Sequence, residues 1–355
     1  MNLDNLSFIK KMDPQAVAES IANFSQQLES GYTTAKKNRL PASYLKYEQI
    51  VVCGMGGSNL ASEIIKRIFI KEIKTPLALV RGYHLPGFVS PKTLVIISSY
   101  SGNTEETLSC LVEAIQAKAK IICLSSGGQL AQIAKKKKMP LFLINPEFNP
   151  SNQPRYDLGS QLGMMLLIFK NIKAINLSDK QITEIIKELA DFSLNFIPAV
   201  SARKNPAKQL SNQLANKQLF LIGAEHLLAN THILANQINE SAKQLAMNYQ
   251  IPELNHHFLE ALEYPTKIQK QIAFIFLYSH NYSENIKKRF SATQKLIAKK
   301  KIANFVIKLE EPDKLKESLK LLTIGSWISF YLAMLNKVNP AKIPWVDWFK
   351  KELTK

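Results

Sequence analysis

The chain has 355 residues, of which 46% are hydrophobic and 21% are charged, a composition typical of a soluble globular protein. Its 13 glycines and 16 prolines are too few for a collagenous or low-complexity chain, and its length favours two domains. The formal charge of +18 suits a nucleic-acid partner, an anionic membrane surface or the attraction of small anionic substrates.

The first half of the chain alternates short apolar runs with amphipathic stretches. A leading helix is predicted before residue 45, with Asp13 as its N-cap and Pro14 in its first turn. From residue 49 onward, continuous apolar runs separated by helices indicate a parallel sheet with helices on both faces. The predicted strands are residues 50–53, 77–80, 94–97, 121–124 and 141–144, and the clearest helices are residues 59–69 and 104–117.

The second half repeats this alternation after a long connecting helix predicted within residues 179–200. The predicted strands are residues 219–222, 272–277 and 305–309, and the predicted helices are residues 231–246, 283–299 and 313–335. We therefore expect an α/β fold with three parts: an N-terminal domain of residues 1–170, a connecting helix within residues 171–200 and a C-terminal domain of residues 201–355.

The cysteines and the apolar segments indicate the cellular compartment. Cys53, Cys110 and Cys123 lie in apolar segments without the spacing of a disulfide framework or a metal site, which predicts buried free thiols in a reducing compartment. The N-terminus lacks the apolar stretch of a signal peptide, and we expect no membrane span because no run of about 18 apolar residues is present. These features favour the cytoplasm.

The lysines are spread through the chain, mostly in short runs such as residues 135–138 and 299–301. No aromatic-interleaved binding motif accompanies these runs, so solvated lysine-rich faces are the favoured interpretation. We therefore expect no specific nucleic-acid partner, and nucleic acid is kept only as a minor alternative.

A glycine-rich turn follows the first predicted strand, with the sequence Gly54-Met55-Gly56-Gly57-Ser58. Glycines let the backbone approach a ligand closely, and the helix that begins there presents unpaired N–H groups and the positive end of its dipole. The combination suits a phosphate, but it lacks the Lys-Ser/Thr of a Walker motif. A tight turn without a ligand explains the same residues.

A hydroxyl-rich segment, residues 98–107, follows the third predicted strand. Ser99, Ser101 and Thr104 cluster at the start of the next helix, where hydroxyl and N–H donors suit a phosphate monoester without a metal ion. Capping of that helix needs a single hydroxyl. Several hydroxyls around Gly102 therefore favour a ligand site when both turns are considered together.

These two segments resemble the sugar-isomerase (SIS) domain, and more closely the bifunctional phosphoglucose/phosphomannose isomerase family. The similarity runs from about residue 45 to the C-terminus. Four further segments resemble that family in the same order: Pro154-Arg155-Tyr156, Asn239-Glu240-Ser241-Ala242-Lys243, Pro252-Glu253-Leu254-Asn255-His256, and Asp347-Trp348-Phe349-Lys350 followed by Leu353.

The resemblance implies two SIS domains, each a parallel sheet flanked by helices in a flavodoxin-like arrangement, assembled as a homodimer. It implies a sugar-phosphate substrate, glucose 6-phosphate or fructose 6-phosphate, with mannose 6-phosphate as a further substrate. The residues implied to bind this substrate are Gly57, Ser58, Ser99, Ser101, Thr104 and, nearby, Arg155.

The resemblance also implies the catalytic residues: Glu240 as the base, His256 as the ring-opening group supplied by the neighbouring subunit, and Lys350 as a lysine that lines the site. A carboxylate can move a proton between C1 and C2 through an enediol, and an imidazole can exchange a proton with the ring oxygen near neutral pH. A cation stabilises the developing oxyanion. This chemistry requires no metal and no cofactor.

Each catalytic candidate also has a structural interpretation. Glu240 lies three residues before Lys243 and could form an exposed ion pair, and His256 with His257 could join His232 or Glu260 in a metal site, although the spacing fits no standard zinc pattern.

The chain departs from the family pattern at three places. His257-Phe258 follows His256 where the family continues Asn-Glu, and residues 59–63 replace small residues after Ser58. Ile343 replaces a threonine before Pro344, which makes mannose 6-phosphate the less secure substrate. A protein that binds a sugar phosphate without converting it is the alternative function.

Overall fold

The structure is a computed structural model, and it describes residues 2–353. The chain folds into two compact units. The first unit is Asn23–Ala190, and the second is Asp191–Lys355 together with Met1–Ala22. These bounds differ from the expected division at residues 170 and 200: the connecting helix is divided at residue 190, and residues 2–22 pack with the C-terminal part of the chain.

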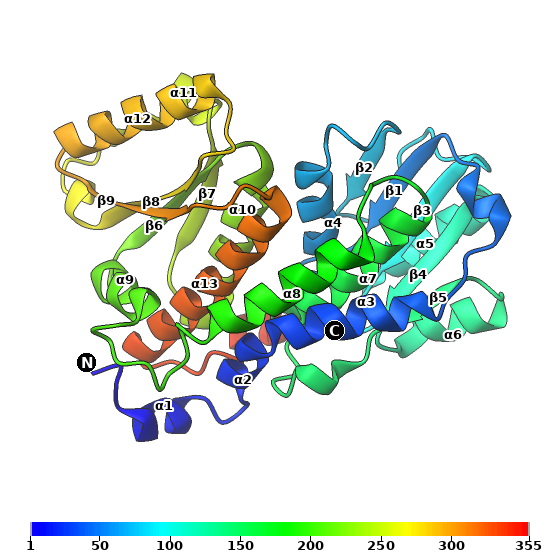
Figure 1. The fold of residues 1–355 in the computed structure, drawn as a ribbon, viewed down its shortest axis with the longest axis horizontal. Coiled ribbons are helices and arrows are strands. Elements are labelled where there is room, and N and C mark those ends of the chain that lie inside the picture. Colours follow the sequence, from blue (N-terminus) through cyan, green and yellow to red (C-terminus); the bar gives the residue numbers. More distant parts are fainter. Residues whose placement is uncertain (1, 354–355) are drawn as a thin grey trace. The chain divides into compact units, whose positions relative to one another are not determined.

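The first unit contains one fully parallel five-stranded sheet, drawn in blue to cyan in Figure 1, with the order β2-β1-β3-β4-β5. Its strands are β1 (Gln49–Cys53), β2 (Leu77–Val80), β3 (Thr93–Ser98), β4 (Lys120–Ser125) and β5 (Leu141–Leu143). Its helices are α3 (Phe24–Lys36), α4 (Gly57–Ile68), α5 (Glu105–Gln116), α6 (Gly128–Lys136), α7 (Leu158–Asn171) and most of α8 (Asp179–Ser193), with short η1 (Ala42–Leu45), η2 (Pro146–Phe148) and η3 (Pro154–Tyr156).

Burial along the central strands confirms the predicted parallel sheet. Consecutive residues Ile50, Val51 and Val52 are all fully buried, although their side chains point alternately to opposite faces. Both faces of this sheet are therefore covered, as in other parallel sheets. Val51 and Cys53 pack in one cluster with Cys110 of α5, and all three cysteines are free and buried, as predicted.

The second unit contains a fully parallel four-stranded sheet with the order β7-β6-β8-β9 (Figure 1). Its strands are β6 (Gln218–Gly223), β7 (Ala246–Gln250), β8 (Ile272–Ser279) and β9 (Ala303–Leu309). Its helices are α1 (Leu6–Met12), α2 (Val17–Ala22), α9 (Pro206–Leu214), α10 (Leu228–Gln237), α11 (Leu254–His257), α12 (Glu284–Lys299), α13 (Lys314–Leu335) and α14 (Pro344–Glu352), with short η4 (Glu225–Leu227), η5 (Ile238–Ala242), η6 (Glu260–Leu262) and η7 (Ile268–Lys270).

The N-terminal segment differs from the single helix that we expected before residue 45. It forms α1, α2 and α3, and Ala16 adopts a left-handed conformation with φ of 57° between the first two. The Asp13 carboxylate accepts hydrogen bonds from the N–H groups of Val17 and Ala18, both at 2.8 Å. Asp13 therefore caps α2, the second of these helices.

The two sheets share one topology. In each sheet the first strand is central, with the second strand on one side and the third on the other. The connections therefore leave the central strand in opposite directions, and such a switch point opens a crevice at the carboxyl ends of the strands. The crevices lie between β1 and β3 in the first unit and between β6 and β8 in the second.

Helix α13 qualifies the expectation that no segment is apolar enough to cross a membrane. It is long and apolar enough by length and composition alone, with a mean hydropathy of 1.4 in its most apolar window. However, 83% of that window is buried inside the protein, as in the core helix of a globular protein.

Candidate active site

The glycine-rich turn joins β1 to α4 at the crevice of the first unit. Gly56 has a φ of +49°, a conformation that favours glycine. A Cβ atom at Gly54 would lie 3.0 Å from the backbone oxygen of Ser98, and one at Gly57 would lie 3.4 Å from the backbone oxygen of Pro154. The turn therefore lies close to the end of β3 and to the segment that carries Arg155.

Ser58 links the two predicted phosphate-binding loops. Its side chain is buried, and its Oγ accepts a hydrogen bond of 3.0 Å from the backbone N–H of Tyr100. The neighbouring Asn59 donates from Nδ2 to the backbone oxygens of Gly54 and Val80, at 3.1 and 3.0 Å. Asn59, one of the departures from the family pattern, therefore holds the turn against the end of β2.

The hydroxyl-rich loop lies between β3 and α5. The buried Ser99 donates from Oγ to Thr104 Oγ1 at 2.9 Å and accepts from the N–H of Gly102 at 3.1 Å. Ser101 is exposed, and its Oγ accepts from the N–H of Asn103 at 3.2 Å. Thr104 is the N-cap residue of α5. The predicted hydroxyls therefore gather at the N-terminus of one helix.

Gly102 fixes this loop against the turn after β4. Its φ is +70°, and a Cβ atom there would lie 1.9 Å from the backbone oxygen of Gly127. A backbone approach of this kind excludes every side chain. The loop is thus held by backbone contacts as well as by its hydroxyl groups.

Arg155 lies in η3 and is only 6% exposed. Its Nη1 donates to Gln153 Oε1 at 2.9 Å, and its guanidinium lies 5.3 Å from the ring centroid of Tyr156. Because Gly57 lies close to the backbone of Pro154, the first unit brings the arginine segment next to the glycine turn.

Glu240 lies in η5, a single turn of π-helix between α10 and β7, and is half-buried. The preceding Asn239 pairs its side-chain amide with the backbone of Ala246, with both hydrogen bonds at 2.8 Å. The turn ends at Lys243, whose φ of +51° is left-handed. Single π-turns inside helices are rare and occur frequently at functional sites.

His256 is exposed on α11, which follows β7. The buried Leu254 and the ring of Phe258 hold this helix to the sheet, since Phe258 lies 4.5 Å from Tyr249 and 5.4 Å from Phe220, centroid to centroid. Phe258, which replaces a family residue, therefore anchors the helix that carries the histidine.

Lys350 is exposed on α14, and Ile343 is the N-cap residue of that helix. Every residue of α14 is at least partly exposed, and Trp345 is 78% exposed.

Glu240 and His256 lie beyond opposite ends of β7. Glu240 precedes this five-residue strand by six positions, and His256 follows it by six. At roughly 3.3 Å per residue, the strand separates its first residue from its last by about 13 Å. The distance between the two side chains also depends on the segments that flank β7, and the segment after the strand folds back along the sheet, since Phe258 packs on Phe220, the register partner of Met247.

The crevice of the second unit has different contents, which the sequence analysis missed. The buried carboxylate of Glu317 accepts hydrogen bonds from Ser279 Oγ at 2.7 Å and from Asn281 Nδ2 at 3.0 Å, and His226 Nε2 lies 2.9 Å away. These side chains bind one another at the carboxyl ends of β6 and β8, while the buried atoms His226 Nδ1 and Glu317 Oε1 have no hydrogen-bond partner in the described part of the chain. The glycine turn and the hydroxyl loop belong to the first unit alone.

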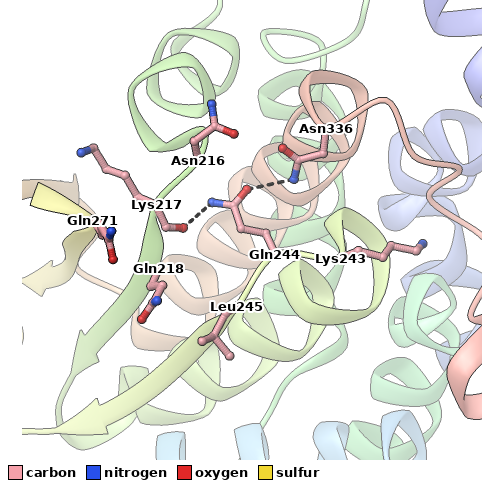
Figure 2. Close-up of a pocket in the computed structure, with 8 residues that line it drawn as sticks. All are labelled: Asn216, Lys217, Gln218, Lys243, Gln244, Leu245, Gln271 and Asn336. Atoms are coloured by element: carbon pink, nitrogen blue, oxygen red, sulfur yellow. Dashed lines mark hydrogen bonds between the residues drawn. The ribbon is translucent and has the colours of Figure 1, made fainter. Parts of the chain in front are cut away.

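Figure 2 shows a surface pocket of about 450 Å³ at the amino ends of β6 and β7. Gln244 donates from Nε2 to the backbone oxygens of Leu214 and Lys217, at 2.9 and 2.8 Å, and Asn336 donates to Gln244 Oε1 at 3.0 Å. The side-chain amides of Gln244 and Asn336 are therefore engaged in hydrogen bonds that hold the surrounding backbone in place. Its lining is Asn216, Lys217, Gln218, Lys243, Gln244, Leu245, Gln271 and Asn336, which includes none of the predicted site residues.

Comparisons with known proteins identify a sugar-isomerase domain in each half of the chain. A family model described as "SIS domain" matches residues 43–146, and one described as "Bacterial phospho-glucose isomerase C-terminal SIS domain" matches residues 203–353. The chain is 31% identical to the bifunctional phosphoglucose/phosphomannose isomerase of Caldicellulosiruptor bescii, over 94% of this chain and 98% of that protein. It is 29% identical to the protein of the same name from Aquifex aeolicus, over 87% of this chain and 91% of that protein.

A solved structure supports the fold. The glucose-6-phosphate isomerase of Chlamydia trachomatis superposes with a TM-score of 0.72, over 99% of this chain and 84% of that chain, at 13% identity. With the two matched domain models, this similarity confirms the expected fold of two SIS domains, each with a parallel sheet flanked by helices.

Proposed function

The chain belongs to the bifunctional phosphoglucose/phosphomannose isomerase family, and from this premise we propose that it interconverts glucose 6-phosphate and fructose 6-phosphate. The observation that carries the proposal is the pair of loops joined by the hydrogen bond between Ser58 and Tyr100 at the crevice of the first unit. Mannose 6-phosphate is proposed as a further and poorer substrate, because Ile343 offers no hydroxyl group.

The phosphate group would be bound at the N-terminus of α5. Backbone N–H groups and the helix dipole favour a dianion at such a position. The hydroxyl groups of Ser58, Ser101 and Thr104 add neutral donors, and Ser99 orients Thr104 by donating its own hydroxyl proton to Thr104 Oγ1. The backbone at Gly57 allows a close approach, and Arg155 adds one positive charge nearby.

The isomerisation itself needs a base, a ring-opening group and a stabilised oxyanion. In the proposed mechanism His256 exchanges a proton with the ring oxygen, and Glu240 then moves a proton between C1 and C2. Lys350 stabilises the negative charge that develops on the oxygen of the enediolate. Each step moves protons only, so the chemistry itself demands no electron carrier.

The proposed assembly is a homodimer in which each site takes His256 from the second copy. The exposure of His256 on α11 supports it, because an exposed imidazole can reach a site in a second copy. The three buried, reduced thiols fit the proposed cytoplasmic location.

An assay of the purified protein with fructose 6-phosphate in the presence of EDTA tests the proposal. We expect aldose formation that EDTA does not reduce. Glu240→Gln should lower the turnover about 100-fold or more, the typical contribution of a general base, with sugar-phosphate binding nearly unchanged. Absent turnover in the wild-type protein would contradict the proposal, and binding without turnover would identify a sugar-phosphate sensor instead.

A further inference from the structure

Behind the hydroxyl loop lies a buried polar cluster that the proposed mechanism does not use. Tyr100 stands between the proposed ligands Ser99 and Ser101, and its side chain is only 7% exposed. Its phenol oxygen accepts a hydrogen bond of 3.3 Å from Nδ2 of the buried Asn149, and it also interacts with the carboxylate of Asp157.

The backbone of Tyr100 is held on two sides. Its N–H donates to Ser58 Oγ, and its carbonyl oxygen accepts from Ser126 Oγ at 2.6 Å and from the N–H of Ser126 at 3.0 Å. These contacts tie the hydroxyl loop to the glycine turn and to the turn after β4. The phenol provides a third connection, to the segment of residues 149–157.

A short chain of hydrogen bonds continues from the phenol to the arginine. Asn149 Nδ2 also donates to the backbone oxygen of Gln153 at 3.2 Å, and Gln153 Oε1 accepts from Arg155 Nη1 at 2.9 Å. Ser151 donates to Asn149 Oδ1 at 2.7 Å, which fixes the orientation of that amide. The Tyr100 side chain therefore connects the hydroxyl loop to the arginine segment.

The protonation state of the Tyr100 phenol suits its role as a connection between the two segments. Burial, together with the nearby Asp157 carboxylate, raises the pKa of the Tyr100 phenol, so the phenol keeps its proton at neutral pH. A protonated phenol can accept from Asn149 and still donate toward Asp157. The hydrogen bond that the structure shows at the phenol is the one from Asn149, and buried hydrogen bonds of this kind hold their members in one arrangement.

We propose that Tyr100 is a positioning residue for phosphate binding, which holds the hydroxyl loop and the segment of Arg155 in register so that both engage the same phosphate group. The proposal rests on the function proposed above, and it adds a residue that touches neither the phosphate nor the reacting carbons through its side chain. Loss of the phenol oxygen should weaken phosphate binding and leave the proton-transfer step nearly unchanged.

The experiment compares Tyr100→Phe with a matched control, Tyr47→Phe. Tyr47 is a half-buried tyrosine of the same unit, and its phenol donates a single hydrogen bond of 2.9 Å to the backbone oxygen of Ile172. For Tyr100→Phe we expect the KM for fructose 6-phosphate and the inhibition constant of inorganic phosphate to rise about 5- to 20-fold, with kcat within about twofold. Tyr47→Phe should leave all three constants within about twofold.

A second variant, Asn149→Ala, removes the partner from the other side. If the Tyr100 and Asn149 side chains act through one connection, the variant that carries both substitutions should bind phosphate no more weakly than the weaker-binding single variant. An unchanged inhibition constant for phosphate in Tyr100→Phe, equal effects of Tyr47→Phe, or multiplied effects in the double variant would each overturn the proposal.

Calorimetric titration with inorganic phosphate separates this proposal from the proposed function. If the wild-type protein shows no turnover, the isomerase function fails, and the phosphate affinities of the same variants still decide the role of Tyr100.

Discussion

The Asp157 carboxyl lies fully buried at the N-terminus of α7, where Ser160 donates a hydrogen bond of 2.5 Å to it. Burial raises the pKa of this carboxyl from 3.8 to about 6. The folded state therefore holds its proton in a pH range where the unfolded state has released it. Stability must fall as the pH rises from about 4 to about 6 and then level off.

Asp157→Asn should remove this dependence. Relative to the variant, the wild-type free energy of unfolding should decrease by about 2 kcal/mol between pH 4 and pH 7. Urea unfolding of both proteins across that range measures the difference, and other titrating groups cancel in the comparison. Parallel stability curves would show that the carboxyl titrates alike in the folded and unfolded states.

Whether the role of a single residue could be predicted from the sequence depended on whether its partners lie close to it in the chain. Ser99, Ser101 and Thr104 were predicted as phosphate ligands because hydroxyls beside a glycine at a strand end are visible in the sequence itself, whereas Ser58 was assigned by family resemblance, and all four roles stay predictions. The roles of Tyr100 and Asn149 were not predicted, since these residues are 49 positions apart and only the fold joins them. The catalytic assignments of Glu240, His256 and Lys350 rest on family resemblance and stay predictions.

At the scale of elements, the edge strand β7 was missed and was instead placed partly inside a helix predicted over residues 231–246. Its sequence, Ala246-Met247-Asn248-Tyr249-Gln250, contains no β-branched residue, and most of it is only half-buried. The fully buried central strands β1, β3, β6 and β8 were predicted, because burial on both faces requires continuous apolar runs. The π-turn η5 has no pattern of its own in the sequence.

The loop between β3 and α5 depends on the absence of a side chain at Gly102. Gly102→Ala combines a positive φ with a Cβ only 1.9 Å from the backbone oxygen of Gly127, so the loop must shift. We expect a loss of about 1–3 kcal/mol in the free energy of unfolding and at least a 10-fold rise in the KM for fructose 6-phosphate. Steady-state kinetics and denaturant titration measure both effects.

Gly87→Ala is the matched control for that substitution. No described atom lies within 4 Å of a Cβ at Gly87, and its φ lies outside the left-handed region. This variant should behave as the wild-type protein does. Near-wild-type kinetics of Gly102→Ala as well would mean that the loop is not held by its approach to Gly127.

At the scale of the whole molecule, two units of related topology carry different side chains at the carboxyl ends of their strands. The crevice of the first unit has glycines and hydroxyls, whereas that of the second is filled by the cluster around Glu317. Parallel sheets flanked by helices were predicted from alternating strands and helices, but the strand order and the bounds of the units were not, because the packing of residues 2–22 leaves no local pattern. The charge of +18 favours the approach of a dianionic substrate.

The central claim is that a sugar-phosphate isomerase site takes Glu240 from one copy and His256 from the other. Mixing Glu240→Gln chains with His256→Ala chains tests it, because each mixed dimer then contains one intact site and one doubly altered site. If subunits exchange freely, a mixture of two inactive proteins should recover about a quarter of wild-type isomerase activity. A mixture that exchanges subunits, as shown by mass spectrometry of the dimers, and yet stays inactive would contradict the account.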